Sequence, residues 1–238
     1  MQQATIDHLN QLNQAFYRTT AQDFSETRQT AWQGWARLSA FLPAVTPLRV
    51  LDVGCGNGRF AHYLHQHNPT LPIHYHGIDT SPDLLTFAQQ KLATLPNVSA
   101  ELSEQDIVMH PLPNREYDLV VLFGVIHHVP SQARRFALMR ELAQSVAKGG
   151  VLAFAAWRFY ENAPLRERLV EWEATWERED GDYLMDWRRG ERALRYCHYV
   201  DDAEHSALVH ATTLAERLRY RADGRDGQLN CYSILERA

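Results

Sequence analysis

The sequence is poor in cysteine and has no long apolar run. Its three cysteines are widely spaced and contain no CxxC pair, which excludes a disulfide framework and a zinc site of the usual spacing. No stretch of about 18 uncharged apolar residues occurs, so no membrane-spanning helix is expected. The polar N-terminal stretch has no signal-peptide core. These absences together predict a cytoplasmic protein with reduced thiols and no metal centre.

Lysine is scarce as well, with only Lys91 and Lys148 among 24 basic residues, and the formal net charge is −5. A negative total argues against non-specific nucleic-acid binding over the whole surface, although it leaves room for a local basic site. The length of 238 residues and the 45% apolar content suit a single domain with one sizeable core.

Apolar strands alternate with helical patterns through the first two thirds of the chain. This rhythm predicts a parallel sheet with helices on both faces. Strands are expected at 48–53, 72–79, 98–102, 117–123 and 151–157. Helices are expected around Leu9, Leu12 and Phe16, at 31–41 and 59–67, after Ser81, and at 131–147. A helix near 202–211 and a hairpin of strands 214–221 and 229–237 follow an irregular, tryptophan-rich segment.

A terminal antiparallel hairpin after five parallel strands is typical of class I methyltransferases. The predicted fold is therefore Rossmann-like α/β, with a seven-stranded, mostly parallel sheet. We expect one methyltransferase domain over 1–238. Its parts are a helical N-terminal cap (1–45), a cofactor-binding core (46–157), an acceptor-side insertion (158–211) and the terminal hairpin (212–238).

The strongest motif follows the first expected strand, where Asp52-Val53-Gly54-Cys55-Gly56-Asn57-Gly58 forms a glycine-rich turn before a helix. Glycines let the backbone approach a ligand closely. The spacing is GxGxG, whereas a dinucleotide fold needs GxGxxG and a phosphate-binding loop needs GxxxxGK[ST]. The turn therefore predicts binding of S-adenosylmethionine (SAM), which has no phosphate, and Asp52 is placed to bind its ammonium group directly or through water.

Further cofactor residues are expected at the ends of the next strands, where open α/β sheets bind ligands. Asp79 ends the second strand and suits the two ribose hydroxyls, while Asp106 suits the adenine amino group with Ile107 against the ring. The expected cofactor-binding residues are Asp52, Gly54, Cys55, Gly56, Asn57, Gly58, Asp79, Thr80, Gln105, Asp106, Ile107 and Phe123.

The segment after the fourth strand, Phe123 to Pro130, faces the transferable methyl group in this fold. It lacks both the Asn/Asp-Pro-Pro-aromatic motif of base N-methylation and a Pro-Cys nucleophile. Direct in-line transfer is therefore expected, with the protein mainly positioning the acceptor. A carboxylate acceptor needs no general base because it is ionised at pH 7. His127 and His128 are candidates to orient the acceptor or to act as a base, and packing or helix capping is the alternative for each.

Four segments give the chain a resemblance to the tRNA wobble-uridine (5-carboxymethyluridine) methyltransferases, which esterify a carboxymethyl group on uridine. The first comprises Phe16-Tyr17, Ala21, Phe24-Ser25-Glu26-Thr27-Arg28 and Trp32, and the second is the glycine turn. The third is Val125-Ile126-His127-His128 followed by Arg134-Arg135, and the fourth is Asp186-Trp187 with Arg195-Tyr196-Cys197-His198. The first and third are the more specific. The resemblance implies a tRNA acceptor, with a small zinc-binding activator subunit as a possible partner.

The resemblance also implies the acceptor residues. Arg28, His127 and His128 are expected to be catalytic, and the substrate-binding set is Arg28, Trp32, Arg188, Arg189, Arg192, Arg195 and His198. Arginines interleaved with aromatics suit a flipped-out nucleotide, although 186–198 also fits a solvated, ion-paired helix. Trp172 and Trp176 are more typical of packing. Two alternatives stay open: a small-molecule carboxyl or O-methyltransferase, and a non-catalytic SAM-binding module.

Overall fold

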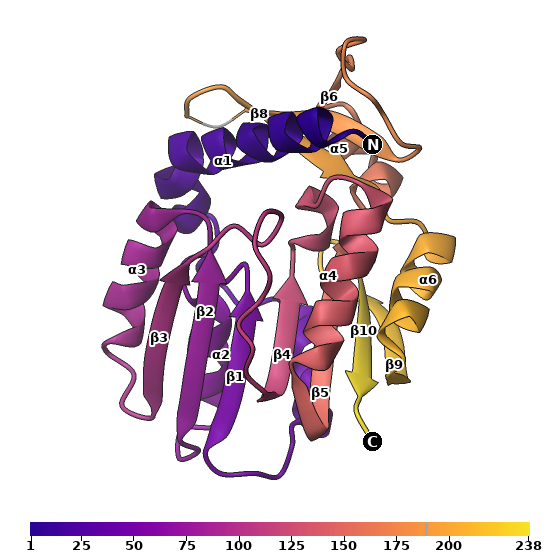
Figure 1. Cartoon of the computed structure of the whole chain (residues 1–238). Coiled ribbons are helices and arrows are strands. Elements are labelled where there is room, and N and C mark those ends of the chain that lie inside the picture. Colours follow the sequence, from indigo (N-terminus) through magenta and orange to yellow (C-terminus); the bar gives the residue numbers. More distant parts are fainter. Residues whose placement is uncertain (189) are drawn as a thin grey trace.

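A computed structural model of the chain describes residues 1–188 and 190–238. Its centre is a seven-stranded sheet of order β3-β2-β1-β4-β5-β10-β9 (Figure 1). Strands β1 to β5 run parallel, and β10 runs antiparallel to both of its neighbours, which confirms the predicted class I sheet. The strands are β1 (Leu48–Val53), β2 (Ile73–Asp79), β3 (Val98–Glu104), β4 (Tyr117–Phe123), β5 (Val146–Trp157), β9 (Ala215–Ala222) and β10 (Asn230–Glu236).

Helices cover both faces of this sheet. Because side chains alternate along a strand, Val120 and Leu122 of β4 enter the core beneath one set of helices, and Leu119 and Val121 enter the other. The first face carries α4 (Gln132–Gln144) and α6 (Asp202–Thr212), and the second carries η1 (Gln33–Phe41), α2 (Arg59–His67) and α3 (Pro82–Leu92). The Ser81 hydroxyl caps α3 by accepting from the Leu84 amide, as the sequence predicts.

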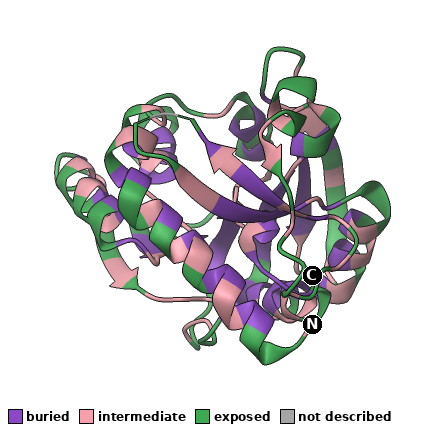
Figure 2. Cartoon of the chain, turned by 90° about the horizontal axis from the view of Figure 1, so that it is seen from above, coloured by how far each residue is buried: buried purple, intermediate pink, exposed green. Residues whose placement is uncertain are grey.

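Helix α1 (Gln3–Glu26) crosses above the carboxyl ends of the parallel strands (Figure 1). Its buried positions include Ile6, Leu9, Asn13 and Phe16, so one side of the helix faces the protein. Figure 2, which views the molecule from above, shows buried and exposed residues alternating along the helix. Helix α1 packs against β8 (Ala193–His198) of the insertion, which closes the space over the strand ends.

Two expected helices differ from the prediction. Helix α4 ends at Gln144 rather than near 147, because Val146 already pairs with Tyr117 of β4 and belongs to β5. Sheet pairing therefore overrides the helical pattern, and the Gly149-Gly150 pair lies inside the strand. The second N-terminal helix is 3₁₀ rather than α and begins at Gln33.

The irregular segment forms a second, three-stranded sheet of β6 (Leu169–Val170), β7 (Asp182–Trp187) and β8 (Ala193–His198). The alternative of an ion-paired helix over 186–198 is therefore wrong, because Asp186 and Trp187 pair with Leu194 and Ala193 across a hairpin. Two short turns precede it, η3 (Phe159–Glu161) and α5 (Ala163–Arg166).

The tryptophans of the insertion take part in packing. The Trp172 indole donates to the Trp176 carbonyl at 3.0 Å, and Trp172 packs beside Leu9 and Tyr196. Cys55, Cys197 and Cys231 are buried free thiols. Within residues 1–188 and 190–238, no helix has the length and apolar character needed to cross a bilayer.

Candidate active site

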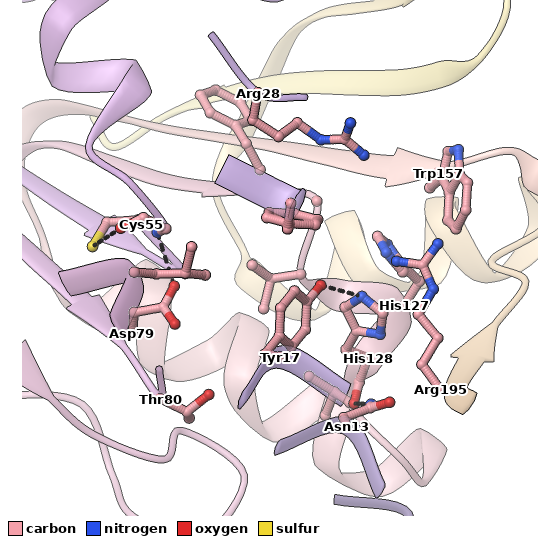
Figure 3. Close-up of a pocket in the computed structure, with 18 of the residues that line it drawn as sticks. Asn13, Tyr17, Arg28, Cys55, Asp79, Thr80, His127, His128, Trp157 and Arg195 are labelled. Carbon is pink, nitrogen blue, oxygen red and sulfur yellow. Dashed lines mark hydrogen bonds between the residues drawn. The ribbon is translucent and has the colours of Figure 1, made fainter. Parts of the chain in front are cut away.

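A cavity of about 430 Å³ lies where the parallel strands end beneath α1 and the β7–β8 hairpin (Figure 3). Most of the residues expected to bind cofactor or acceptor line it. From the cofactor set these are Gly54, Cys55, Gly56, Asn57, Asp79, Thr80, Gln105, Asp106, Ile107 and Phe123. From the acceptor set they are Arg28, Trp32, His127, His128 and Arg195.

The glycine turn shapes the floor of the cavity. Gly54 and Gly56 have φ values of 76° and 53°, in the left-handed region that favours glycine. A Cβ on Gly54 would lie 2.1 Å from Val125, whereas a Cβ on Gly56 would meet no protein atom within 4 Å. The Gly56 backbone therefore borders open space, as a turn that cradles a ligand requires. This geometry fits SAM.

Asp79 is fixed beside that turn at the end of β2. Its two carboxylate oxygens accept from the backbone amides of Gly56 at 2.8 Å and Ser81 at 2.9 Å. Burial raises the pKa of Asp79, and the backbone amides counteract part of that rise. Because it lines the cavity, Asp79 can also accept from ligand hydroxyls.

Asp52 does not line the cavity, which disfavours direct contact with the ammonium group and leaves contact through water as the prediction. The Tyr75 hydroxyl donates to its carboxylate at 2.5 Å, inside the sheet. Burial raises the pKa of Asp52 to about 7. Gly58 is also absent from the cavity wall. It is the N-cap residue of α2 and lies near Ala88 of α3.

Asp106, which lines the cavity, is held by helix α1. Its carboxylate accepts from Asn10 at 2.6 Å and Gln14 at 2.8 Å, and from the Val108 amide at 2.9 Å. These bonds orient the carboxylate on the cavity wall before any ligand arrives. Gln105 lines the cavity too, but its side-chain amide donates to the Pro111 carbonyl.

His128 has protein partners at both ring nitrogens. Its Nδ1 lies 3.0 Å from the Tyr196 carbonyl, which accepts, so Nδ1 carries the proton and Nε2 accepts from the Tyr17 hydroxyl at 2.9 Å (Figure 3). Burial lowers the pKa of His128 to about 3, which keeps the ring neutral. This geometry favours a positioning role for His128 over that of a base.

His127 differs from its neighbour. It is 4% exposed, and its Nδ1 has no hydrogen-bond partner among the described residues. Burial, followed by the neighbouring His128, lowers the pKa of His127 well below its ordinary value. A neutral, buried imidazole on the cavity wall suits hydrogen bonding to a bound molecule.

Arg195 enters the same region from β8. It is 7% exposed, and its guanidinium lies 4.9 Å from the Phe16 ring centre and 5.0 Å from that of Trp157. No carboxylate within 4.0 Å pairs with it in the part of the chain that the structure describes, and its one side-chain hydrogen bond runs to the Met185 sulfur. A buried cation of this kind suits an anionic ligand.

Two further arginines line the cavity near the end of α1. Arg28 lies 4.8 Å from the Phe24 ring centre. Arg59, which the sequence interpretation missed, lies over the Trp32 and Trp35 rings, and burial lowers its pKa to about 10. The Asn57 amide donates to Ser25, which ties the glycine turn to the end of α1.

The remaining predicted acceptor residues do not line the cavity. Arg188 and Arg192 are exposed, and Arg188 pairs with Asp186. His198 is buried between two carboxylates, as described below. Arg189 falls outside the described residues. Strand β8 therefore brings Arg195 to the cavity and directs its neighbours elsewhere.

Sequence reasoning missed Asn13, Tyr17 and Trp157 as well, all of which line the cavity. Tyr17 lies within the first of the four segments that resemble the tRNA methyltransferase family. The resemblance could therefore have identified it. Asn13 and Trp157 belong to a helix and a strand with no local motif, and only the packing of α1 over β5 and β8 brings them to the site.

Comparison with known proteins points to methyltransferases. Residues 51–152 match a family model described as a methyltransferase domain. The chain is 28% identical over 160 residues to a probable tRNA methyltransferase 9B of Mus musculus, covering 66% of this chain and 32% of that protein. It is 24% identical over 156 residues to a tRNA (carboxymethyluridine(34)-5-O)-methyltransferase of Schizosaccharomyces pombe, and this match covers 64% of this chain and 60% of that protein.

A third relative is a trans-aconitate 2-methyltransferase of Methylobacterium nodulans, 36% identical over 118 residues, with 50% of this chain and 42% of that protein covered. The chain thus spans about a third of the length of the first tRNA methyltransferase relative. Among solved structures, one is magnesium protoporphyrin IX methyltransferase from Synechocystis with bound S-adenosylhomocysteine (SAH). It superposes with a TM-score of 0.65 at 16% identity, and the match covers 96% of this chain and 99% of that chain. The fold is that of class I SAM-dependent methyltransferases, residues 51–152 match a methyltransferase domain, and the chain resembles the tRNA wobble-uridine methyltransferases.

Proposed function

We propose that this enzyme methylates a carboxylate oxygen of a carboxymethyl group on a tRNA wobble uridine. The observation that carries the proposal is Arg195, a buried guanidinium on the cavity wall without a carboxylate partner among the described residues. A carboxylate on the acceptor would neutralise it and accept two parallel hydrogen bonds from its planar fork. The tRNA relatives supply the acceptor class.

In this proposal the cofactor half of the cavity comprises Gly54, Gly56 and Asp79, together with Asp106, which α1 holds. In this proposal Asp79 accepts from the ribose hydroxyls and Asp106 faces the adenine. Arg28 and Arg59 lie near the glycine turn and bring positive charge to that part of the wall.

The acceptor half needs no proton transfer. When SAM is bound, it supplies a sulfonium-activated methyl group, and the carboxylate oxygen forms the new C–O bond as the S–CH₃ bond breaks, with its electron pair passing to sulfur. A carboxylate is already ionised at pH 7. Arg195 would orient it, and the neutral His127 ring would hydrogen-bond the acceptor. Positioning of this kind is the main contribution that the protein makes.

The direct test uses labelled SAM and tRNA from cells that accumulate carboxymethyluridine, followed by nucleoside mass spectrometry. The expected product is a methyl ester, from which mild alkali releases methanol. An alkali-stable product would reject the carboxylate acceptor. Binding to tRNA should weaken steeply as salt rises, because phosphate contacts release counterions.

A small-molecule carboxylate is the second candidate, since the aconitate methyltransferase relative matches half of the chain. Turnover of a free carboxylic acid that is independent of salt, with no activity on tRNA, would favour it. Assays on tRNA should also be run with a zinc-binding activator subunit of the wobble-uridine system. The edge strand β3, with Ser99, Ala100 and Glu101 exposed, is the surface that we propose for its docking.

A further inference from the structure

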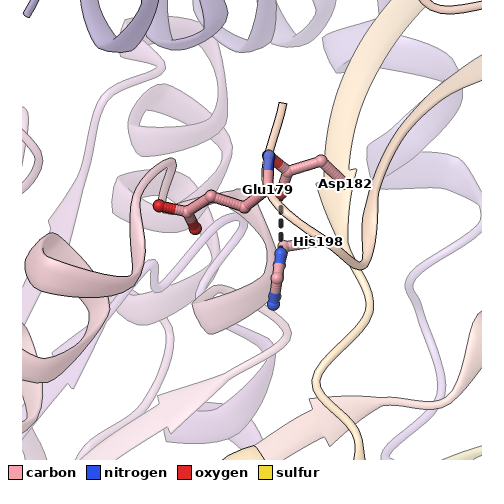
Figure 4. Close-up of side chains that lie close together, drawn as sticks. All are labelled: Glu179, Asp182 and His198. Carbon is pink, nitrogen blue, oxygen red and sulfur yellow. Dashed lines mark hydrogen bonds and ion pairs between the residues drawn. The ribbon is translucent and has the colours of Figure 1, made fainter. Parts of the chain in front are cut away.

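A buried charge network lies beside the acceptor half of the cavity, at the end of β8. Its centre is His198, which is 2% exposed. The Nδ1 of His198 lies 2.7 Å from Asp182, and Nε2 lies 2.6 Å from Glu204 (Figure 4 shows the Asp182 side). Because both partners are carboxylates, both ring nitrogens donate, which is the arrangement of a charged imidazolium. Burial would lower the pKa of His198, but the two carboxylates outweigh it and raise the pKa.

Arg135 of α4 completes the network from the opposite side. Its guanidinium, 1% exposed, donates to Glu204 at 2.8 Å and to Glu179 at 3.0 Å, and also to the Val129 carbonyl. Glu179, Asp182 and His198 lie close enough together to suggest a cation site. Arg135 already pairs with Glu179, and both His198 nitrogens bond to carboxylates. The positive charge that balances these carboxylates therefore comes from Arg135 and His198, and no metal ion is required.

Tyr196 connects this network to the cavity. Its hydroxyl donates to Asp182 at 2.6 Å, so its side chain belongs to the network. Its backbone holds two residues of the cavity wall, because the carbonyl accepts from His128 and the amide donates to Asn13 of α1 at 2.8 Å. One residue before it, Arg195 turns to the other face of β8 and lines the cavity.

We propose that His198 is a positioning residue: with Asp182, Glu204 and Arg135 it fixes β8, so that Arg195 keeps its place on the acceptor wall and the Tyr196 carbonyl keeps its hydrogen bond to His128. His198 does not line the cavity, so it acts through β8 rather than through the substrate. The inference rests on the proposed function for its effect on turnover. Its structural part, the link from His198 to His128, can be measured without any acceptor.

The first test follows the histidine rings by NMR in ¹⁵N-histidine-labelled protein, with the twelve histidines assigned by substitution. In the wild type, His198 should show two protonated nitrogens, and His128 should show one protonated Nδ1. His198→Asn should shift or lose the His128 Nδ1–H signal. His205→Asn is the matched control, because His205 is also a buried histidine, on α6, with Ser233 Oγ as its partner. It should leave the His128 signal in place.

The second test measures kinetics on carboxymethyluridine-containing tRNA. His198→Asn should lower kcat by about 10-fold or more while the Kd for SAH stays within about 2-fold, since misplacement of acceptor groups affects the chemical step. If His198→Asn fails to fold, the same measurements on Glu204→Gln test the positioning role, because this variant keeps a hydrogen-bond acceptor for His198 and removes one charge.

The outcomes separate the two claims. A wild type that is inactive on this tRNA would reject the proposed function, and the NMR result would still decide the link. A folded variant with an unchanged His128 signal and unchanged kcat would overturn the positioning role of His198. Equal losses of kcat and of SAH affinity would also overturn the positioning role, because they would indicate that His198 supports the structure in general.

Discussion

Single residues divide the cavity into two electrostatic settings. Asp79 lies at one end, held by the backbone amides of Gly56 and Ser81, and Arg195 lies at the other between aromatic rings (Figure 3). A carboxylate suits the hydroxyls of a ribose, and an unpaired guanidinium suits an anion. Substitutions at the two ends should therefore affect different kinetic constants.

Asp79→Ala should weaken binding of SAM and SAH by about 1–3 kcal/mol, because hydrogen-bonding groups of protein and ligand would lose their partner. Isothermal titration calorimetry with SAH measures this loss. Asp83→Ala is the control, since Asp83 is exposed in the first turn of α3. Equal affinity in wild type and Asp79→Ala would place the cofactor elsewhere.

Arg195→Lys should keep the affinity for SAH and lower kcat/KM for the acceptor by about 100-fold, which corresponds to about 2.7 kcal/mol. Lysine keeps the charge but lacks the planar fork that binds a carboxylate through two parallel bonds. The matched control is Arg192→Lys, three residues earlier and exposed. Loss of SAH binding in Arg195→Lys would move this residue into the cofactor half.

At the scale of elements, α1 joins the cofactor half to the acceptor half. Asn10 and Gln14 hold Asp106, while Asn13 donates to the His128 carbonyl at 3.2 Å and accepts from the Tyr196 amide. Its position over the strand ends therefore depends on polar contacts as well as on its apolar face.

Asn13→Ala should destabilise the docked position of α1 by about 1–3 kcal/mol, because it removes the partner of the partly buried His128 carbonyl and of the buried Tyr196 amide. Hydrogen exchange should show faster exchange across α1, and SAH should dissociate faster. Gln22→Ala, on the exposed side of the same helix, should change neither. Protection of α1 equal to that of the wild type would contradict this role.

At the scale of the whole molecule, buried histidines should make stability depend on pH. Burial lowers the pKa of His205 to about 3, against about 6.5 in an unfolded chain. Between these values the unfolded state binds a proton that the folded state does not. The stabilisation is therefore complete above about pH 6.5 and falls as the pH decreases. Asp52, with a pKa raised to about 7, acts in the opposite direction.

His205→Asn should make the acid loss of stability shallower by up to about 1.4 kcal/mol per pH unit, which is the effect of one proton. Urea unfolding at several pH values between 6.5 and 4 measures the slope. Substitution of the exposed His74 should leave the slope unchanged. Parallel profiles for wild type and His205→Asn would show that His205 is protonated in the folded state.

The sequence alone determined the sheet and the glycine turn because both depend on short-range patterns. The nearly all-apolar run of β4 and the Ser81-Pro82 helix start each encode their structure within a few residues. The position of Asp79 at a strand end likewise follows from the parallel sheet. Helix α4 ended early because the pairing of Val146 with Tyr117 is a contact between distant segments.

Only the tertiary structure decided which side chains meet at the acceptor wall. Arg188, Arg192, Arg195 and His198 share one charged segment, and nothing local distinguishes them. The β7–β8 hairpin turns Arg195 toward Phe16 of the distant helix α1, and it buries His198 against Asp182 and Glu204. The physical reason is that strand alternation and long-range packing set the direction of a side chain, whereas sequence spacing sets only its place along the chain.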